Sequence, residues 1–315
     1  MKTAIKYFFV WIGWMFLGAL LMLFPAMILG FAINGGHIGE LFDNPWTFSL
    51  IMVGSQVLPI YVFWRSKYAN FSIHKSLNNV KLYLWMALAA IGVIFFNGIM
   101  ESYLPFAEME MEDLEFLDVM MKNPIGIVSA CILAPLAEEA VFRGAIERSL
   151  LDRGWKPWLA ILVSTLFFSV AHFNLTQGTA TIIAGALLGW VYYRTRNLWP
   201  CVFVHAVNNT IATVANFIPE ESVMESSLPV DLAWTAGAIA LFCFAIYRFN
   251  RQTEPHLQQV LAEQQLLAEQ QAEAEQQAFY ELNRISEPHP VPPPFPQSQQ
   301  HDDNLLAEME RNDVE

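Results

Sequence analysis

Long blocks of apolar residues, separated by short polar stretches, make up most of this chain of 315 residues. Several blocks approach or exceed the ~18 consecutive apolar residues that suggest a transmembrane helix. With 55% hydrophobic and only 15% charged residues, the chain is too apolar for an ordinary soluble protein. The blocks therefore predict an all-α polytopic membrane protein, a bundle of about eight transmembrane helices.

The loops between these blocks alternate in charge. The expected spans are 7–33, 46–64, 82–100, 124–152, 158–173, 178–193, 199–217 and 228–247. Lys and Arg gather at the N-terminus, in the loops 65–81, 148–156 and 194–198, and after the last span, whereas the intervening loops are acidic or neutral. Because Lys and Arg favour the cytoplasmic side of a membrane, we expect a multi-pass protein with both termini in the cytoplasm.

Four regions are expected along the chain. They are the first three helices with their loops (1–122), a helical core with the candidate site (123–217), the last transmembrane helix (218–251) and a tail (252–315). The tail is rich in Gln, Glu and Ala over 256–284 and in proline over 288–296. We expect an exposed helix followed by disordered chain, which either solubilises the protein or docks a cytoplasmic partner.

The charge and the cysteines argue against nucleic-acid binding and against a cysteine-based metal or redox site. The net charge of −13 comes largely from Glu254 onward and offers no basic face for nucleic acid. Cys131, Cys201 and Cys243 all lie in apolar blocks without a C-x-x-C spacing, so they are interpreted as small core residues. The acidic run from Glu101 to Asp118 is interpreted as a solvated loop.

Three charged residues stand inside an apolar run that begins near Pro124. Glu138, Glu139 and Arg143 occupy the stretch Ala134–Gly144, where a charge within a membrane costs ~2.5 to ~17 kcal/mol. On a helix, Glu139 and Arg143 stand at i, i+4 and can pair, while Glu138 lies about 100° around the axis. Such residues need a partner, a wet cavity or a function; the alternative is that they only end a helix at the membrane surface.

Three further polar residues lie in apolar surroundings. His172 follows Phe168 at i, i+4, so that the aromatic ring can pack against the imidazole. His205 and Asn209 have the same spacing in a later span. Each histidine alone would be interpreted as a hydrogen-bonded core residue. Together with two carboxylates and an arginine, the two histidines indicate a polar site. Burying several polar side chains in a membrane is costly, so it is not expected without a function.

These residue types can hydrolyse a peptide bond. Glu138 or Glu139 could deprotonate a water, and His172 could orient that water or protonate the leaving amine. His205 and Asn209 could donate hydrogen bonds to an oxyanion, each worth ~3–4 kcal/mol in the transition state. Arg143 could hold Glu139 ionised. No Ser or Cys has a base at a suggestive spacing, which disfavours a covalent route.

A metal offers an alternative with the same residues. Two His and one Glu match a catalytic zinc site with one open position, although the H-E-x-x-H spacing is absent. We expect hydrolysis without a metal and without a cofactor, and we keep a zinc-bound water as the alternative. Counting residues from the turn near Gly154 places Glu138 and His172 at similar depth on antiparallel helices. On straight helices His205 lies at a different depth, so a tilt or a break near Pro135 is expected.

The pattern resembles a known family. Glu-Glu-x-x-x-Arg at 138–143, Phe-x-x-x-His at 168–172 and His-x-x-x-Asn at 205–209 are similar to the motifs of the CAAX-processing and bacteriocin-processing membrane proteases, the Abi or type II CAAX prenyl endopeptidase family. The resemblance covers 124–217. It implies an intramembrane endopeptidase acting on a membrane-associated peptide or protein, in a family described both as zinc metalloproteases and as metal-free glutamate proteases.

The resemblance also implies roles for individual residues. Glu138 corresponds to the catalytic base, His172 works with it, and His205 and Asn209 form the oxyanion site. Glu139 and Arg143 match the supporting positions. Nothing in the sequence indicates a prenylated substrate. The alternative function is a non-enzymatic membrane scaffold or immunity protein that binds a partner through the polar cavity or the tail; a transporter ranks last, because no inverted repeat is evident.

Overall fold

The structure, a computed structural model, describes residues 1–33, 44–72, 77, 79–101, 103, 121–172, 175–215, 217–218 and 227–286. Within these ranges the regular structure is helical and contains no strand, which confirms the all-α class. The chain divides into two compact units, Met1–Val260 and Leu261–Glu315. Most of the acidic loop before residue 119 and the proline-rich segment 288–296 lie outside the described residues.

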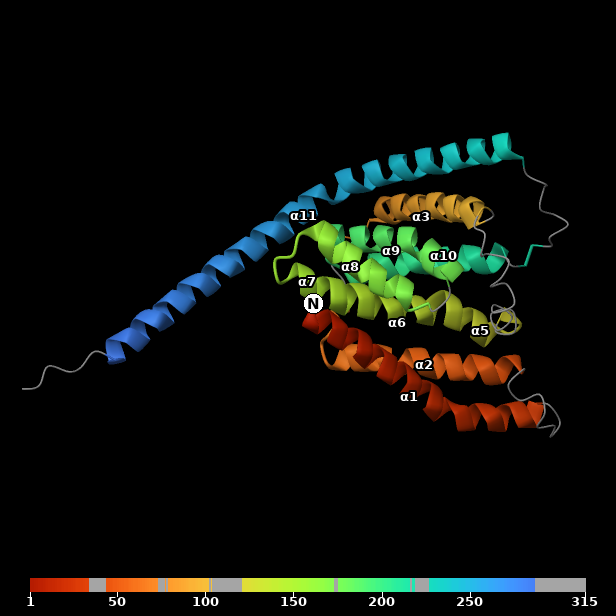
Figure 1. Cartoon of the computed structure of the whole chain (residues 1–315), viewed down its shortest axis with the longest axis horizontal. Coiled ribbons are helices and arrows are strands. Elements are labelled where there is room, and N and C mark those ends of the chain that lie inside the picture. Colours follow the sequence, from red (N-terminus) through yellow and green to blue (C-terminus); the bar gives the residue numbers. More distant parts are fainter. Residues whose placement is uncertain are drawn as a thin grey trace, which may run out of the picture. The chain divides into compact units, whose positions relative to one another are not determined.

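The helices follow the predicted blocks closely up to α10, whereas the predicted span 228–247 and the predicted tail helix 256–284 form one continuous helix, α11 (Figure 1). They are α1 (Lys2–Ile33), α2 (Pro45–Arg65), α3 (Val80–Glu101), α8 (Pro157–Val170), α9 (Leu175–Thr195), α10 (Leu198–Ala215) and α11 (Leu228–Ser286). Between α3 and α8 runs a helix of five consecutive segments, here called the central helix. Its segments are α5 (Pro124–Val128), η4 (Ser129–Leu133), α6 (Ala134–Val141), η5 (Phe142–Glu147) and α7 (Arg148–Leu151), of which η4 and η5 are π-helical.

Six helical segments of the described chain are long and apolar enough to cross a membrane, fewer than the eight predicted. They are α1, α2, α3, the central helix, α10 and α11. The helix α8 has 14 residues, and at ~1.5 Å per residue it falls short of a ~30 Å hydrocarbon core. The helix α9 is long enough, but it mixes its apolar residues with Gly, Thr and Gln. The eight helices exist as predicted, and two of them are not candidate spans.

The central helix is the most enclosed of the candidate spans. Half of its span is buried, against 17% for α1. It packs against α1 and α2 on one side and against α8 and α10 on the other (Figure 1). Phe142 on this helix and Phe168 on α8 meet edge-to-face in the core, with ring centroids 5.2 Å apart. The predicted polar residues on this helix are therefore held inside the bundle.

The sequence left open a tilt or a break near Pro135, and the central helix continues through this residue without an interruption. A π-helical turn precedes the proline instead, and the Ala134 N–H donates to the Ser129 carbonyl five residues earlier. Pro135, the next donor position, has no N–H. The carbonyl of Ala130 receives a hydrogen bond from Asn209 Nδ2 on α10 at 3.0 Å. A side chain from another helix thus replaces the donor that the proline lacks.

The predicted basic loops meet at one end of the bundle. Four contacts between chain segments join them: Arg153 Nη2 to Thr3 Oγ1 (2.8 Å), Arg196 Nη1 to Asp152 Oδ1 (3.2 Å), Asn197 Nδ2 to the Ser72 carbonyl (3.0 Å) and Arg194 Nη2 to Glu254 Oε2 (2.8 Å). The charge alternation along the sequence therefore corresponds to a real grouping in space.

Candidate active site

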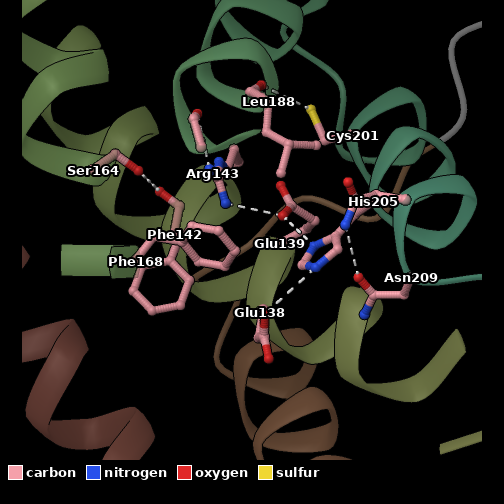
Figure 2. A network of polar contacts seen from close by, with 12 residues as sticks. Glu138, Glu139, Phe142, Arg143, Ser164, Phe168, Leu188, Cys201, His205 and Asn209 are labelled. Carbon is pink, nitrogen blue, oxygen red and sulfur yellow. Dashed lines mark hydrogen bonds and ion pairs between the residues drawn. The ribbon is translucent and has the colours of Figure 1, made fainter. Parts of the chain in front are cut away.

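The ion pair between Glu139 and Arg143 is present and buried, as the i, i+4 spacing predicts. Arg143 Nη1 donates to Glu139 Oε1 at 2.9 Å, and both side chains are inaccessible to solvent. Arg143 Nη2 donates to the Gly185 carbonyl on α9 at 3.0 Å, and the guanidinium lies 4.6 Å from the centre of the Phe168 ring. The arginine is thus held by a carboxylate, a carbonyl and an aromatic face from three helices (Figure 2).

Glu139 also contacts His205, a residue 66 positions later in the chain. The Oε1 atom that accepts from Arg143 lies 2.8 Å from His205 Nδ1. His205 is almost fully buried at 5% exposure, and its ring stands edge-on to Phe168. A carboxylate bonded to one imidazole nitrogen fixes the orientation of the ring, so Nε2 is directed away from Glu139.

Glu138, the neighbouring carboxylate, is directed elsewhere and reaches solvent. Its Oε2 lies 3.7 Å from His205 Nε2, and its side chain is 23% exposed, whereas Glu139 is fully buried. Figure 2 shows the two carboxylates leaving α6 in different directions on either side of the imidazole ring of His205. Of the two, only Glu138 is placed to contact a water molecule in the cavity.

A cavity of about 90 Å³ lies beside Glu138. Its polar lining comprises Glu138, His172, Asn209, His205, Thr181 and Asn208, and its apolar walls include Ala90, Val93, Leu187 and Val204. A water occupies about 30 Å³ in the liquid, so the cavity has room for a nucleophilic water and one small group. Glu139 and Arg143 stand behind this lining, where they support His205 without facing the cavity.

His172 reaches the same cavity from the end of α8. Its Nδ1 lies 2.9 Å from the Phe168 carbonyl, and its ring packs edge-to-face on Phe168 at 4.9 Å, as the spacing predicts. The expected match in depth between Glu138 and His172 agrees with their shared cavity. His205 reaches this cavity as well, and the Phe168 ring lies edge-on to both imidazoles.

Asn209 lines the cavity and is also engaged by the protein. One N–H of its amide is used by the Ala130 carbonyl, and Asn208 Nδ2 donates to its Oδ1 at 3.3 Å. A carboxamide has two N–H donors. The second N–H of Asn209 is the one that could serve a group in the cavity, with the side chain already held in place.

The arrangement does not fit the zinc site that the sequence left open. Among the described residues, no three His, Cys, Asp or Glu side chains lie close enough together to hold a metal ion. No step is therefore assigned to a metal below.

Sequence reasoning missed Gly185 and Gly189 on α9. A Cβ at Gly185 would come within 3.0 Å of Thr165 and 3.2 Å of Phe168, and one at Gly189 within 2.9 Å of Glu147 Oε2. Both glycines let α9 approach the central helix and α8 closely. The signal was available, since Gly-x-x-x-Gly in an apolar stretch favours close helix packing in membranes.

Sequence reasoning also missed Glu147, which follows Glu139 by two turns of the central helix. Its side chain is fully buried, and neither carboxylate oxygen has a hydrogen-bond partner among the described residues. It does not line the cavity beside Glu138. Glu147 could have been found as a further charge within the same apolar run.

The described residues define a helical protein with six candidate membrane spans, in which Glu138, His172 and His205 line one cavity. Residues 121–211 match the family model of the Rce1-like type II CAAX prenyl endopeptidases. This confirms the resemblance carried by the three motifs, all of which lie inside the matched segment. The "Putative membrane peptidase YdiL" of Bacillus subtilis (strain 168) is 27% identical over 146 residues.

That alignment covers 45% of this chain, and the chain spans 59% of the length of the relative. No solved structure matches the chain. The family match covers the central helix, α8, α9 and most of α10, the helices that carry the site.

Proposed function

We propose that this protein is a membrane-embedded endopeptidase that hydrolyses a peptide bond of a membrane-associated protein or peptide. The observation that carries the proposal is the position of Glu138, whose carboxylate opens on a small cavity 3.7 Å from His205 Nε2. The match of residues 121–211 to an endopeptidase family supports it. Residues 123–217 form the catalytic core in this proposal.

The first step is attack by water. Glu138 takes a proton from a water in the cavity, oriented with the help of His172, and the water oxygen bonds to the carbonyl carbon of the substrate. The carbonyl oxygen becomes an oxyanion beside His205 and Asn209. Since His205 Nδ1 is engaged by Glu139, donation to the oxyanion must come from Nε2, which requires a proton on both ring nitrogens.

The second step breaks the carbon–nitrogen bond. The leaving nitrogen takes a proton from Glu138 or from His172, so the products are a carboxylic acid and an amine. Glu139 and Arg143 touch no substrate atom in this scheme. They hold the imidazole of His205 in one orientation through the buried contacts at 2.8 and 2.9 Å.

The orientation in the membrane is also proposed from the charge distribution. The basic loops share one end of the bundle, and this end faces the cytoplasm if the rule for Lys and Arg holds. Both termini are then cytoplasmic. The tail 252–315 would extend on that side, available for a cytoplasmic partner.

The test compares the protein N-termini in membranes from cells that produce the wild-type chain or the Glu138→Gln variant. Mass spectrometry should detect new N-termini with the wild-type chain that are absent with Glu138→Gln. Glu269→Gln, which changes an exposed carboxylate on α11, serves as the matched control and should leave them unchanged. A folded Glu138→Gln protein that yields the same N-termini would contradict the proposal and favour a non-enzymatic scaffold.

A further inference from the structure

Two adjoining grooves lie away from the cavity, where α2 and α7 end. The larger, of about 770 Å³, is lined by Trp64, Arg65, Lys67, Ala69, Asn70, Phe71, Ser72 and Arg148. The smaller, of about 280 Å³, is lined by Tyr7, Tyr68, Lys67, Ala145, Arg148, Ser149, Asp152 and Arg153. Lys67 and Arg148 belong to both linings and separate the two grooves. The larger one is called the basic groove below.

The basic groove carries an excess of positive charge. It has three cations, Arg65, Lys67 and Arg148, and no acidic side chain among its described lining residues. The nearby Asp152 is shared: its carboxylate pairs with Arg148 at 3.4 Å and with Arg196 at 3.2 Å. The groove therefore suits an anion that enters from outside the protein.

The backbone at Lys67 gives a second, independent observation. The Lys67 N–H donates to the Trp64 carbonyl at 3.1 Å, and the Tyr68 N–H donates to the Phe63 carbonyl at 3.0 Å. This pattern is a Schellman cap, whose αL position is usually glycine. Lys67 occupies it with φ of 56°, a strained conformation for a residue with a Cβ.

Stabilisation of the helix end does not explain why lysine, and not glycine, occupies the αL position. A cation near a helix C-terminus favours the helix dipole, which accounts for Arg65 and Arg148. Glycine would close α2 at Lys67 with less strain. Strain kept at Lys67 points to a use for its side chain, and this side chain lines the groove.

The groove also lies where two candidate membrane spans end. The helix α2 and the central helix are candidate membrane spans, and both finish here, at Arg65 and Leu151. Trp64, which is more than half exposed, and Phe71 line the groove beside the cations. Aromatic residues next to Lys and Arg are typical of the layer where lipid headgroups meet water.

We propose that the basic groove binds the phosphate of an anionic phospholipid headgroup. Arg65 and Arg148 supply planar guanidinium donors that suit phosphate oxygens, and Lys67 supplies a compact charge between them. Trp64 and Phe71 pack against the glycerol and the first methylenes of the acyl chains. The site is separate from the cavity beside Glu138, since the two linings share no residue.

The test uses the full chain, purified in a neutral detergent and titrated with phosphatidylglycerol or phosphatidylcholine. Native mass spectrometry counts the lipids retained. The wild-type chain should retain phosphatidylglycerol at least tenfold more tightly than phosphatidylcholine. Lys67→Gly and Arg148→Ala should each lower the affinity for phosphatidylglycerol about fivefold. This factor corresponds to about 1 kcal/mol per basic residue near an anionic surface. Lys156→Ala, an exposed lysine outside both grooves, should change neither affinity.

Lys67→Gly separates lipid binding from folding. Because glycine relieves the αL strain, the variant should melt at the same or a higher temperature in detergent while it loses phosphatidylglycerol. Unchanged retention in both groove variants would overturn the proposal, and so would an equal loss in Lys156→Ala. Displacement of the lipid by millimolar inorganic phosphate would also overturn it, since the groove would then be a site for free phosphate.

Discussion

The site-bearing helices and the pair formed by α1 and α2 are held together in different ways. Around the central helix, the buried carboxylate of Glu139 accepts from Arg143 at 2.9 Å and lies 2.8 Å from the imidazole of His205. Between α1 and α2 the closest approach is between glycines: a Cβ at Gly18 would lie 2.1 Å from the Gly54 carbonyl oxygen. The site region combines these polar partners with close glycine contacts on α9, whereas α1 and α2 meet at glycines and through a buried hydrogen bond from Thr47 Oγ1 to the Ala26 carbonyl.

The difference follows from the bilayer as a solvent. Apolar side chains gain little by leaving lipid for protein, so α1 and α2 associate through the close backbone approach that glycine permits. Buried charges are costly there, and in the core Glu139 and Arg143 satisfy each other. Polar substitutions should therefore act mainly on the core, and added bulk mainly on α1 and α2.

The largest effect is expected at Glu138. Glu138→Gln should lower the rate of formation of the cleavage product by about 10²–10⁴-fold, because the general base is lost. Its stability should change by less than about 0.5 kcal/mol, since the side chain is partly exposed. Cleavage rates of the purified protein check the first expectation, and thermal melting in detergent checks the second. A large loss of stability would show that Glu138 belongs to the structural network instead.

Arg143→Met should disrupt the core next. It leaves the Glu139 carboxylate buried without its cation, and breaking a buried pair in this way costs about 3–5 kcal/mol. Cleavage should fall as well, because His205 loses its oriented partner. Chemical unfolding in detergent measures the first effect. The comparison fails if Arg143→Met unfolds like the wild-type chain.

Gly54→Ala should act on the other region, through sterics alone. Its Cβ would lie 2.4 Å from the Gly18 carbonyl oxygen, so α1 and α2 must separate, at a cost of about 1–3 kcal/mol. The cleavage rate of the protein that remains folded should stay near wild type. Gly13→Ala on α1 is the matched control, because nothing lies within 4 Å of its added Cβ. Equal destabilisation by both variants would remove the role assigned to the glycine contact.

Glu147→Met should have the smallest effect, and of opposite sign. Neither oxygen of Glu147 has a hydrogen-bond partner among the described residues, so an apolar side chain of similar size removes two buried polar atoms. Replacements of this kind are neutral or stabilising by about 1 kcal/mol or more. Thermal melting in detergent, with the wild-type chain and Arg143→Met measured alongside, gives the change in stability. A loss above about 1 kcal/mol would mean that Glu147 has a stabilising role like that of Glu139.

Contacts within one helix were accessible from the sequence. Glu139 with Arg143, and Phe168 with His172, are each four residues apart, and helical geometry places such residues on one face. The separation of Glu138 from Glu139 around the axis follows from the same geometry. The candidate site residues could therefore be named before the structure, although their catalytic roles remain proposals.

Contacts between helices were not accessible in the same way. The pairing of Glu139 with His205 depends on how α10 is rotated and how deep it lies against the central helix. The use of Asn209 depends on a π-helical turn before Pro135 that frees the Ala130 carbonyl. The described chain has two candidate spans fewer than predicted, because α8 is apolar but short and α9 mixes its apolar residues with Gly, Thr and Gln.

The sequence by itself determined the helical class, the helices that carry the polar residues and the pairs along each helix, because block length and a repeat of 3.6 residues are local properties. Only the tertiary structure decided that Glu139 is enclosed behind His205 while Glu138 opens on the cavity, and that Lys67 meets Arg148 in a basic groove. The rotation and depth of one helix against another depend on close packing at glycines and on local π turns, and the apolar pattern of a single helix does not specify them.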